Sequence, residues 1–220
     1  MDPINCKLVA WDEIDAWTNK VAAKIAGKGY KPDVCIGMTR GGWVPSRLIC
    51  DRLRIKDLHA IKTEHWGITA TRDGEAKLAA PLTIDVKKKN LLVVDDITDT
   101  GQSLGLALEH AKALGASSVM SATLLHITHS KVTPDFYAVK VPADDWTWFI
   151  FPWNFNEDVQ SLVRKALDDG EKAERDIIRM LREQCNISLD LEVLKRTLAE
   201  LTERNEVKKK GAKWSNVKKK

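Results

Sequence analysis

Long hydrophobic runs are absent from this chain of 220 residues. No apolar stretch approaches the roughly 18 residues that a membrane-spanning helix requires, so we expect no membrane contact. The first residues, MDPINCKLVAWDEID, are acidic and lack the basic start and apolar centre of a signal peptide. These absences predict a cytoplasmic protein.

Cysteine is scarce, and the spacing of the few residues present shows no pairs. This pattern predicts reduced thiols and argues against a disulfide framework or a zinc site. The four positions are Cys6, Cys35, Cys50 and Cys185. His126 and His129 have no cysteine nearby in the sequence, and we interpret them as loop histidines rather than metal ligands.

Net charge is small outside the C-terminal tail. The chain carries +4, and residues 206–220 hold seven lysines and one glutamate, so the other 205 residues sum to −2. A basic run is usually a solvated end of the chain and sometimes contacts nucleic acid. We favour the solvated interpretation for this tail.

The most informative stretch is LLVVDDITDTGQS, residues 91–103. Its four leading apolar residues predict a buried strand, which ends in the carboxylates Asp95 and Asp96. A loop of small hydroxyl residues and one glycine follows, and apolar residues at helical spacing continue to Leu114. Unsatisfied N–H groups at a helix N-terminus bind phosphate, whereas paired carboxylates suit vicinal hydroxyls, a metal, or both. A ligand with a ribose diol and a 5′-phosphate fits this layout.

The surrounding pattern alternates strands with helices, which predicts an α/β fold with a parallel sheet covered on both faces. Ligands of such sheets bind beyond the carboxyl ends of the strands, so the loops at residues 39–42 and 95–103 should face one crevice. Residues 64–83 are polar and predict a loop. The expected helices are 11–29 and one opened by Pro45, and the expected strands are 33–38, 58–63 and 117–125.

Residues 136–154 read FYAVKVPADDWTWFIFPWN and are rich in aromatic side chains. One interpretation is a small aromatic subcore, and the other is a surface on which a planar base stacks. After a phosphate-binding loop, we favour base stacking.

Three segments, in order, resemble the type I phosphoribosyltransferases, and most of all the short purine enzymes of the xanthine–guanine type. MTRGGWVPSRL resembles their diphosphate loop, LLVVDDITDTGQS the loop that binds 5-phosphoribosyl 1-diphosphate (PRPP), and YAVKVPADDWTWFIFPWN the hood over the base. The resemblance implies a parallel-sheet phosphoribosyltransferase domain over 1–155, with the hood at about 136–155. Residues 156–220 would form a helical extension with a basic tail, in an arrangement faintly like a winged helix.

The resemblance also implies a role for each matching residue. The diphosphate would lie on Thr39, Arg40, Gly41 and Gly42. The ribose hydroxyls would lie on Asp95 and Asp96, with Asp96 near magnesium. The 5-phosphate would lie within Thr98, Asp99, Thr100, Gly101, Gln102 and Ser103. Asp99 would manage the proton of the purine imidazole ring, and Trp148 and Phe149 would bracket the base.

The implied function is Mg²⁺-dependent transfer of the phosphoribosyl group from PRPP to xanthine, guanine or hypoxanthine, by a homodimer in purine salvage. The alternative is a regulator that senses PRPP and binds nucleic acid through the basic tail. A regulator need not keep the diphosphate loop, Asp99 and the aromatic hood together, which favours the enzyme.

The sequence departs from the family where the 6-oxopurine enzymes carry a lysine aimed at the purine O6. His126 or Ile127 stands at the equivalent place, and Lys131 is a candidate from the following loop. The identity of the base therefore stays open. In the loop at 64–83, Arg72 and Lys77 are candidates to reach the diphosphate.

The C-terminal segment predicts three helices and a hairpin. Apolar spacing indicates one helix ending near Gly170, a second ending near Cys185, and a third capped by Ser188. A short hairpin would turn at Gly211. We favour an extension that packs on the catalytic body or on a second subunit.

Overall fold

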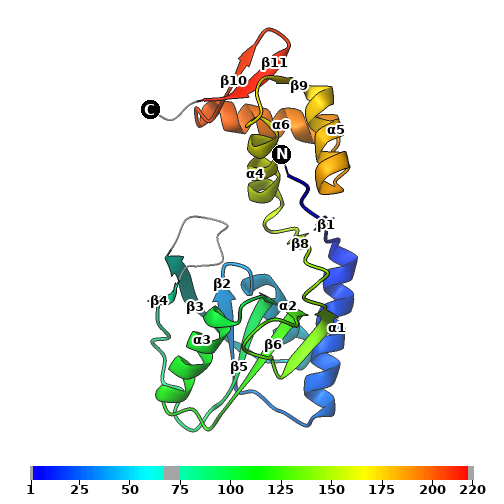
Figure 1. Ribbon diagram of the computed structural model, residues 1–220. Helices are drawn as coiled ribbons and strands as arrows, with labels where there is room; N and C mark the ends of the chain where they lie inside the picture. The colour runs from blue at the N-terminus through cyan, green and yellow to red at the C-terminus, as the bar shows by residue number, and fades with distance from the viewer. Residues whose placement is uncertain (1, 67–74, 218–220) are drawn as a thin grey trace. The chain divides into compact units, whose positions relative to one another are not determined.

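The computed structural model describes residues 2–66 and 75–217, and the chain divides into two compact units (Figure 1). The sheet unit comprises Trp11–Asp145. The C-terminal unit comprises Trp146–Lys220 together with the first ten residues, Met1–Ala10. The first residues of the chain therefore belong with its last.

The sheet unit is built on six strands in the order β4-β3-β2-β5-β6-β7. All neighbours are parallel except β3 and β4, which are antiparallel. This confirms the predicted α/β fold with a mostly parallel sheet. The elements are α1 (Trp11–Gly27), β2 (Val34–Thr39), α2 (Trp43–Leu53), β3 (Asp57–Trp66), β4 (Glu75–Ala80), β5 (Asn90–Thr98), α3 (Gln102–Ala113), β6 (Ser118–Ile127) and β7 (Phe136–Val141).

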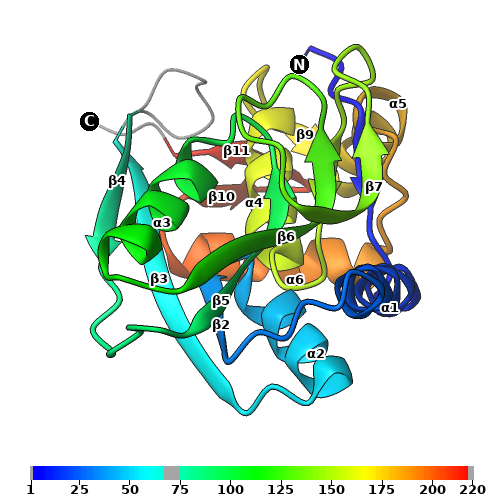
Figure 2. The same cartoon turned by 90° about the horizontal axis from the view of Figure 1, so that it is seen from below.

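Helices cover both faces of this sheet, with α3 on one face and α1 and α2 on the other (Figure 2). Alternate residues of a strand point to opposite faces. Val34 and Ile36 of β2 accordingly pack in the cluster that contains Leu104 of α3, whereas Cys35 packs with Ile25 of α1 and Ile49 of α2. Burial on both faces explains why the central strands read as continuous apolar runs.

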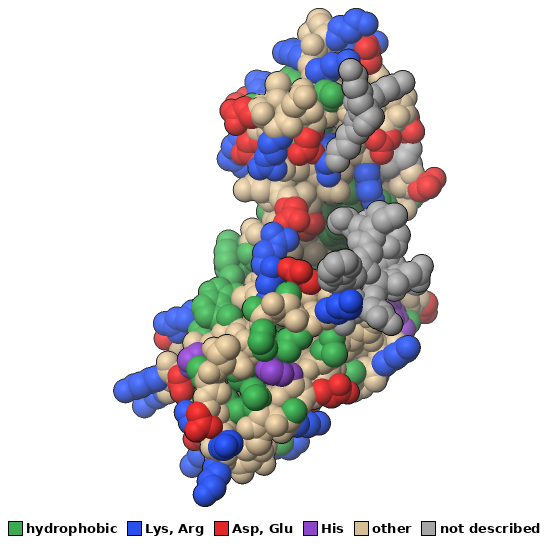
Figure 3. Space-filling view, turned by 90° about the vertical axis from the view of Figure 1, so that its left-hand side faces the viewer, with side chains coloured by type: hydrophobic (Ala, Val, Ile, Leu, Met, Phe, Trp, Pro, Cys, Tyr) green, Lys and Arg blue, Asp and Glu red, His purple; other side chains and the backbone are tan. Residues whose placement is uncertain are grey.

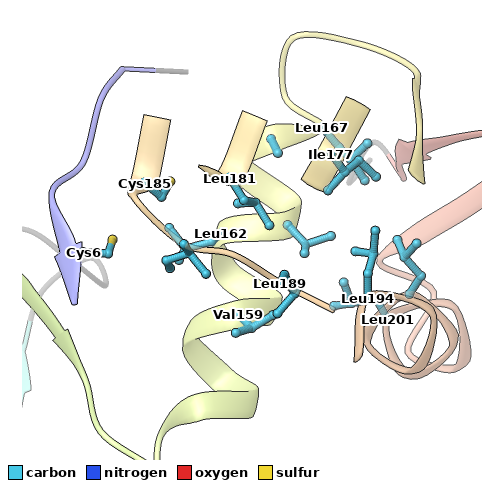
Figure 4. Close-up of a cluster of buried hydrophobic side chains, with 14 of the residues drawn as sticks. Cys6, Val159, Leu162, Leu167, Ile177, Leu181, Cys185, Leu189, Leu194 and Leu201 are labelled. Atoms are coloured by element: carbon cyan, nitrogen blue, oxygen red, sulfur yellow. The ribbon is translucent and has the colours of Figure 1, made fainter. Parts of the chain in front are cut away.

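The C-terminal unit contains β1 (Cys6–Leu8), β8 (Trp148–Ile150), α4 (Phe155–Ala166), β9 (Lys172–Ala173), α5 (Glu174–Cys185), α6 (Leu191–Glu203), β10 (Val207–Lys210) and β11 (Lys213–Asn216). Strands β1 and β8 pair in parallel, and β10, β11 and β9 form a small antiparallel sheet in that order. The three helices enclose a separate apolar core, which includes Leu162, Leu181 and Leu194 (Figure 4).

Two local predictions differ from the structure. The segment 64–83 is not a loop throughout, because β3 runs to Trp66 and β4 begins at Glu75 and pairs with it. The N-cap of α6 is Asp190 rather than Ser188, and its carboxylate accepts a hydrogen bond from the Glu192 N–H at 2.7 Å. Leu189 is buried in the helical core, so the helix begins only after this residue is packed. Within the described parts of the chain, no helix has the length and apolar character needed to cross a membrane.

The separate core of the C-terminal unit predicts a stability difference between two leucines of α6. Leu198 is fully buried, so Leu198→Ala should lower the free energy of unfolding of this unit by about 2–5 kcal/mol. Leu191 is 42% exposed, and Leu191→Ala should change it by less than about 0.5 kcal/mol. Denaturant unfolding followed by circular dichroism measures both. Equal losses in the two variants would contradict the assigned core.

Candidate active site

Two loops meet at the carboxyl ends of the neighbouring parallel strands β2 and β5. The loop after β2 carries Thr39 to Gly42, with a cis peptide bond between Thr39 and Arg40. A methyl group added at Gly41 would lie 2.1 Å from Oδ2 of Asp96, so the two loops are in direct contact. The two loops are thus neighbours, as the predicted shared crevice requires, and a side chain at position 41 would collide with the Asp96 carboxylate.

Each loop leads into a helix whose N-terminus carries no side-chain cap. Helices α2 and α3 begin after Gly42 and Gly101, neither has an acidic residue in its first turn, and Gly101 has a φ of 81°. The other four helices of the described chain all have acidic residues in their first turns. Unsatisfied N–H groups and the helix dipole make an uncapped N-terminus attractive to anions. The site therefore presents two anion-binding helix ends on adjacent strands.

Two carboxylates lie between these helix ends. Asp96 is buried, and its Oδ1 accepts a hydrogen bond from the Ile97 N–H at 2.8 Å, while Asp95 Oδ1 accepts one from the Asp96 N–H at 3.0 Å. Burial, and then the adjacent charge of Asp96, raise the pKa of Asp95 well above its usual range. A cation or a pair of ribose hydroxyls would relieve this repulsion.

The residues present fit Mg²⁺ as a partner shared with substrate. Mg²⁺ is commonly held by one or two carboxylates and completed by substrate phosphates and water. Asp95 and Asp96 supply hard oxygen ligands of that kind. Among the described residues no cluster of three or more acidic, histidine or cysteine side chains could hold a metal by protein ligands alone.

The loop after β5 contains further polar groups suited to a phosphate. The Oγ1 of Thr98 is buried and has no hydrogen-bond partner among the described residues. Beyond it, Thr100, Gly101, Gln102 and Lys131 are among the residues that line a hollow of about 400 Å³. Backbone and hydroxyl donors are thus gathered at the start of α3.

Asp99 is paired with His129, which the sequence predicts only as a loop histidine. The Nε2 of His129 lies 2.5 Å from Oδ1 of Asp99, and both side chains are partly exposed. Strands β5 and β6 run parallel with Thr98 opposite His126, so residues just past both strand ends become neighbours. The parallel arrangement of successive strands was the available signal for this pair.

The three candidates for the O6-recognition position differ in exposure and charge. Ile127 is buried on β6. His126 is buried too, and burial and then Lys140 lower the pKa of its imidazole, which makes it a poor cation. The Lys131 side chain is exposed, and its backbone N–H donates to the Thr100 carbonyl at 3.2 Å. Of the three, Lys131 brings positive charge to the loop.

The remaining predicted residues lie elsewhere in the chain. Trp148 and Phe149 form most of β8, in the C-terminal unit, where Trp148 packs partly buried against the helical core and Lys165 Nζ lies 5.5 Å from its ring centroid. Their contact with a base stays a prediction. Lys77 lies on β4, and Arg72 falls outside the described residues.

Comparison with known proteins identifies the class. The profile of the phosphoribosyl transferase domain matches residues 10–160, and the chain belongs to that family. The predicted resemblance and the predicted enzyme class are therefore confirmed.

Three similar proteins show which members of the family this chain resembles. The xanthine-guanine phosphoribosyltransferase of Cereibacter sphaeroides is 26% identical over 151 residues, which are 66% of this chain and 85% of that protein. The crystal structure of a purine phosphoribosyltransferase from Pyrococcus horikoshii is similar with a TM-score of 0.59 and 31% identity, over 68% of this chain and 94% of that one. A hypothetical protein from Neisseria gonorrhoeae, solved with bound ppGpp, gives a TM-score of 0.59 and 25% identity, over 70% of this chain and 90% of that one.

The tight fit at Gly42 gives a test of the loop. A Cβ there would lie 2.4 Å from the Val94 carbonyl oxygen and 2.8 Å from the Asp95 Cα, both rigid backbone atoms. Gly42→Ala should therefore shift the loop, cost about 1–3 kcal/mol of stability and weaken PRPP binding. Gly27→Ala is the control, because no atom lies within 4 Å of its Cβ position. Isothermal titration with PRPP and Mg²⁺ and thermal unfolding measure the two effects; unaltered PRPP binding in Gly42→Ala would argue against this loop as the diphosphate site.

Proposed function

We propose that this enzyme transfers the phosphoribosyl group of PRPP to a purine base in purine salvage, with Mg²⁺ bound together with the diphosphate. The observation that carries the proposal is the pair of uncapped helix ends on adjacent strands, with two carboxylates between them. PRPP carries a phosphate group on each side of a ribose diol. The two helix ends suit the phosphate groups, and the carboxylates between them suit the diol. The relatives named as purine phosphoribosyltransferases support the choice of base.

The proposed binding roles follow the two loops. The start of α2 and residues Thr39, Arg40, Gly41 and Gly42 hold the diphosphate. Asp95 and Asp96 accept hydrogen bonds from the ribose hydroxyls, and Asp96 also faces the metal. The start of α3, with Thr98, Asp99, Thr100, Gly101, Gln102 and Ser103, surrounds the 5-phosphate. The family resemblance further implies that Trp148 and Phe149 pack on the base, and that the enzyme is a homodimer.

The chemistry is a substitution at the anomeric carbon. The bond from this carbon to the diphosphate oxygen breaks, and the oxygen leaves with the electron pair. A ring nitrogen of the purine forms the new bond and gives up its proton, for which Asp99 is the acceptor. Mg²⁺, when bound, neutralises charge on the diphosphate. The helix end and Arg40 add fixed positive charge at the same group, which stabilises the charge that develops as the bond breaks.

The first test is diphosphate release from PRPP and Mg²⁺ with xanthine, guanine, hypoxanthine and adenine supplied separately. We expect turnover with at least one 6-oxopurine, and Asp99→Asn should lower kcat by on the order of 10²–10³ because the proton acceptor is lost. PRPP binding should persist in that variant. Tight PRPP binding without turnover on any base would overturn the proposed transfer and favour a PRPP-sensing role.

We further propose that His129 positions the Asp99 carboxylate. A hydrogen bond to a charged group contributes about 1.5–3 kcal/mol, so His129→Gln should lower kcat by roughly 10- to 100-fold. The control is His59→Gln, because His59 Nε2 makes a similar contact with Asp57 Oδ1, at 2.7 Å, at the opposite end of the sheet. Its activity should match the wild type.

The double variant distinguishes positioning from a general structural effect. If His129 acts through Asp99, then Asp99→Asn combined with His129→Gln should be no slower than Asp99→Asn alone. Losses that multiply in the double variant would show that His129 acts independently of Asp99.

A further inference from the structure

The C-terminal unit extends beyond the part of the chain that the family accounts for. The match to the phosphoribosyl transferase domain ends at residue 160, within α4. The following elements are β9, α5, α6 and the hairpin β10–β11, and the edge strand β9 pairs with β11. The order helix, strand, helix, helix, hairpin is that of a winged helix, in which the hairpin is the wing.

The base of the hairpin is fixed to the helices. Val207 is buried in the helical core. The Asn216 side-chain amide donates to the Arg164 carbonyl at 2.9 Å and to Asp168 Oδ1 at 2.7 Å, and the Trp214 indole donates to Glu174 Oε1 at 3.2 Å. The hairpin therefore projects from the unit at a set position and turns at Gly211, which has a φ of 62°.

Positive charge is concentrated on this hairpin. Residues 146–206 carry nine basic and thirteen acidic residues, a net charge of −4, whereas 207–217 contain four lysines and no acidic residue. All four are exposed, and blue side chains are prominent over this end of the unit (Figure 3). We call Lys208, Lys209, Lys210 and Lys213 the hairpin lysines.

These lysines are largely available to an outside anion. Lys208 and Lys213 form no ion pair with any residue that the structure describes, and Lys209 lies over the Trp214 ring at 5.2 Å. Lys210 has one loose partner, Glu171, at 3.7 Å, and both of these side chains are exposed. Such an exposed pair contributes little and is readily exchanged for a phosphate.

Helix α6 presents a second surface of the same unit. Its buried side faces the core through Leu194, Leu198 and Leu201. Its exposed side carries Arg196, Ala199 and Lys195, whose Nζ lies 2.8 Å from Oε1 of Glu192 in an exposed pair that a phosphate can replace. Glu203, at the far end of the helix, is exposed as well. The small side chain of Ala199 allows close approach to a groove, and Arg196 brings positive charge to it. Asp190 and Glu192 make the helix N-terminus itself unattractive to phosphate, so the hairpin would supply most phosphate contacts.

We propose that the C-terminal unit binds duplex DNA, with α6 in the major groove and the hairpin lysines on the phosphate backbone. In helix-turn-helix proteins the second helix enters the major groove and the first crosses the backbone, roles that here fall to α6 and α5. The major groove of B-form DNA admits an α-helix, whereas the major groove of duplex RNA is too deep and narrow for side chains to read. Single strands are bound by exposed aromatic stacking surfaces, but the hairpin's one aromatic ring, Trp214, is partly buried and held by Glu174.

The test is fluorescence anisotropy of the full chain with a labelled DNA duplex of mixed sequence, titrated between about 50 and 200 mM salt. We expect the affinity to fall on the order of a hundredfold or more over this range, because each lysine on a phosphate contributes about −0.9 to the slope of log K against log salt. Replacing the four hairpin lysines by Gln should weaken binding and reduce that slope by about four. Replacing them by Arg should preserve binding. The Arg variant changes the same four positions but keeps the charge, so it shows whether a loss in the Gln variant comes from charge or from misfolding.

The matched control removes the same charge from the sheet unit. Lys20, Lys56, Lys87 and Lys112 are exposed there and lie outside the candidate active site, so their replacement by Gln should leave DNA binding and its salt slope close to the wild type. All variants should retain diphosphate release, which reports on the other unit. No binding at low salt, an equal loss in both Gln variants, or tighter binding to duplex RNA than to duplex DNA would each overturn the proposal.

A second variant tests the orientation. Lys195→Gln with Arg196→Gln should weaken binding without any change in the hairpin. If this variant binds as tightly as the wild type while the hairpin variant does not, α6 is not in the groove and the proposal fails in that part.

Discussion

The parallel pairing of β2 with β5 is the constraint on which the candidate active site depends. Parallel neighbours bring their carboxyl ends to one edge of the sheet, so the chain leaves both strands at the same place and enters α2 and α3 there. Two helix N-termini are thereby set side by side. Gly41 then lets the loops approach closely, because a side chain at this position would have to displace the Asp96 carboxylate. The anion-binding ends and the acidic pair follow from this one register.

This arrangement also places two carboxylates next to each other at the site. Asp95 and Asp96 are adjacent, and the raised pKa of Asp95 reflects first its burial and then the charge of Asp96. Acids with perturbed pKa values are concentrated at functional sites, which supports placing the site at this pair. The two carboxylates therefore favour a bound group that brings hydroxyls or a cation.

Much of the sheet unit could be predicted from the sequence because its signals are local. Residues 91–103 combine an apolar strand, two carboxylates and a glycine before an apolar helix, and each of these features has the expected structure. The contact of His129 with Asp99 was missed because it joins residues 30 positions apart, past the ends of two different strands. The strand predicted at 58–63 is part of β3, but its extension to Trp66 and the whole of β4 were missed because the polar residues there show no clear alternation. The cap of α6 was misplaced because Ser188 and Asp190 are both residue types that cap helices, and it is the Asp190 carboxylate that accepts the Glu192 N–H.

The first ten residues have a consequence for how the chain is assembled. Since β1 pairs with β8 and Cys6 lies in the same core as Cys185, the C-terminal unit is made from both ends of the chain, and the sheet unit is inserted between them. During synthesis the insert can be complete while the unit around it still lacks its last strands, so the N-terminal strand must wait for its partner. A fragment beginning at residue 146 would lack strand β1 and the side chains of Ile4 and Cys6, which pack in its core. In this protein the boundary between the two units is crossed twice, and neither unit can be cut away with a single break.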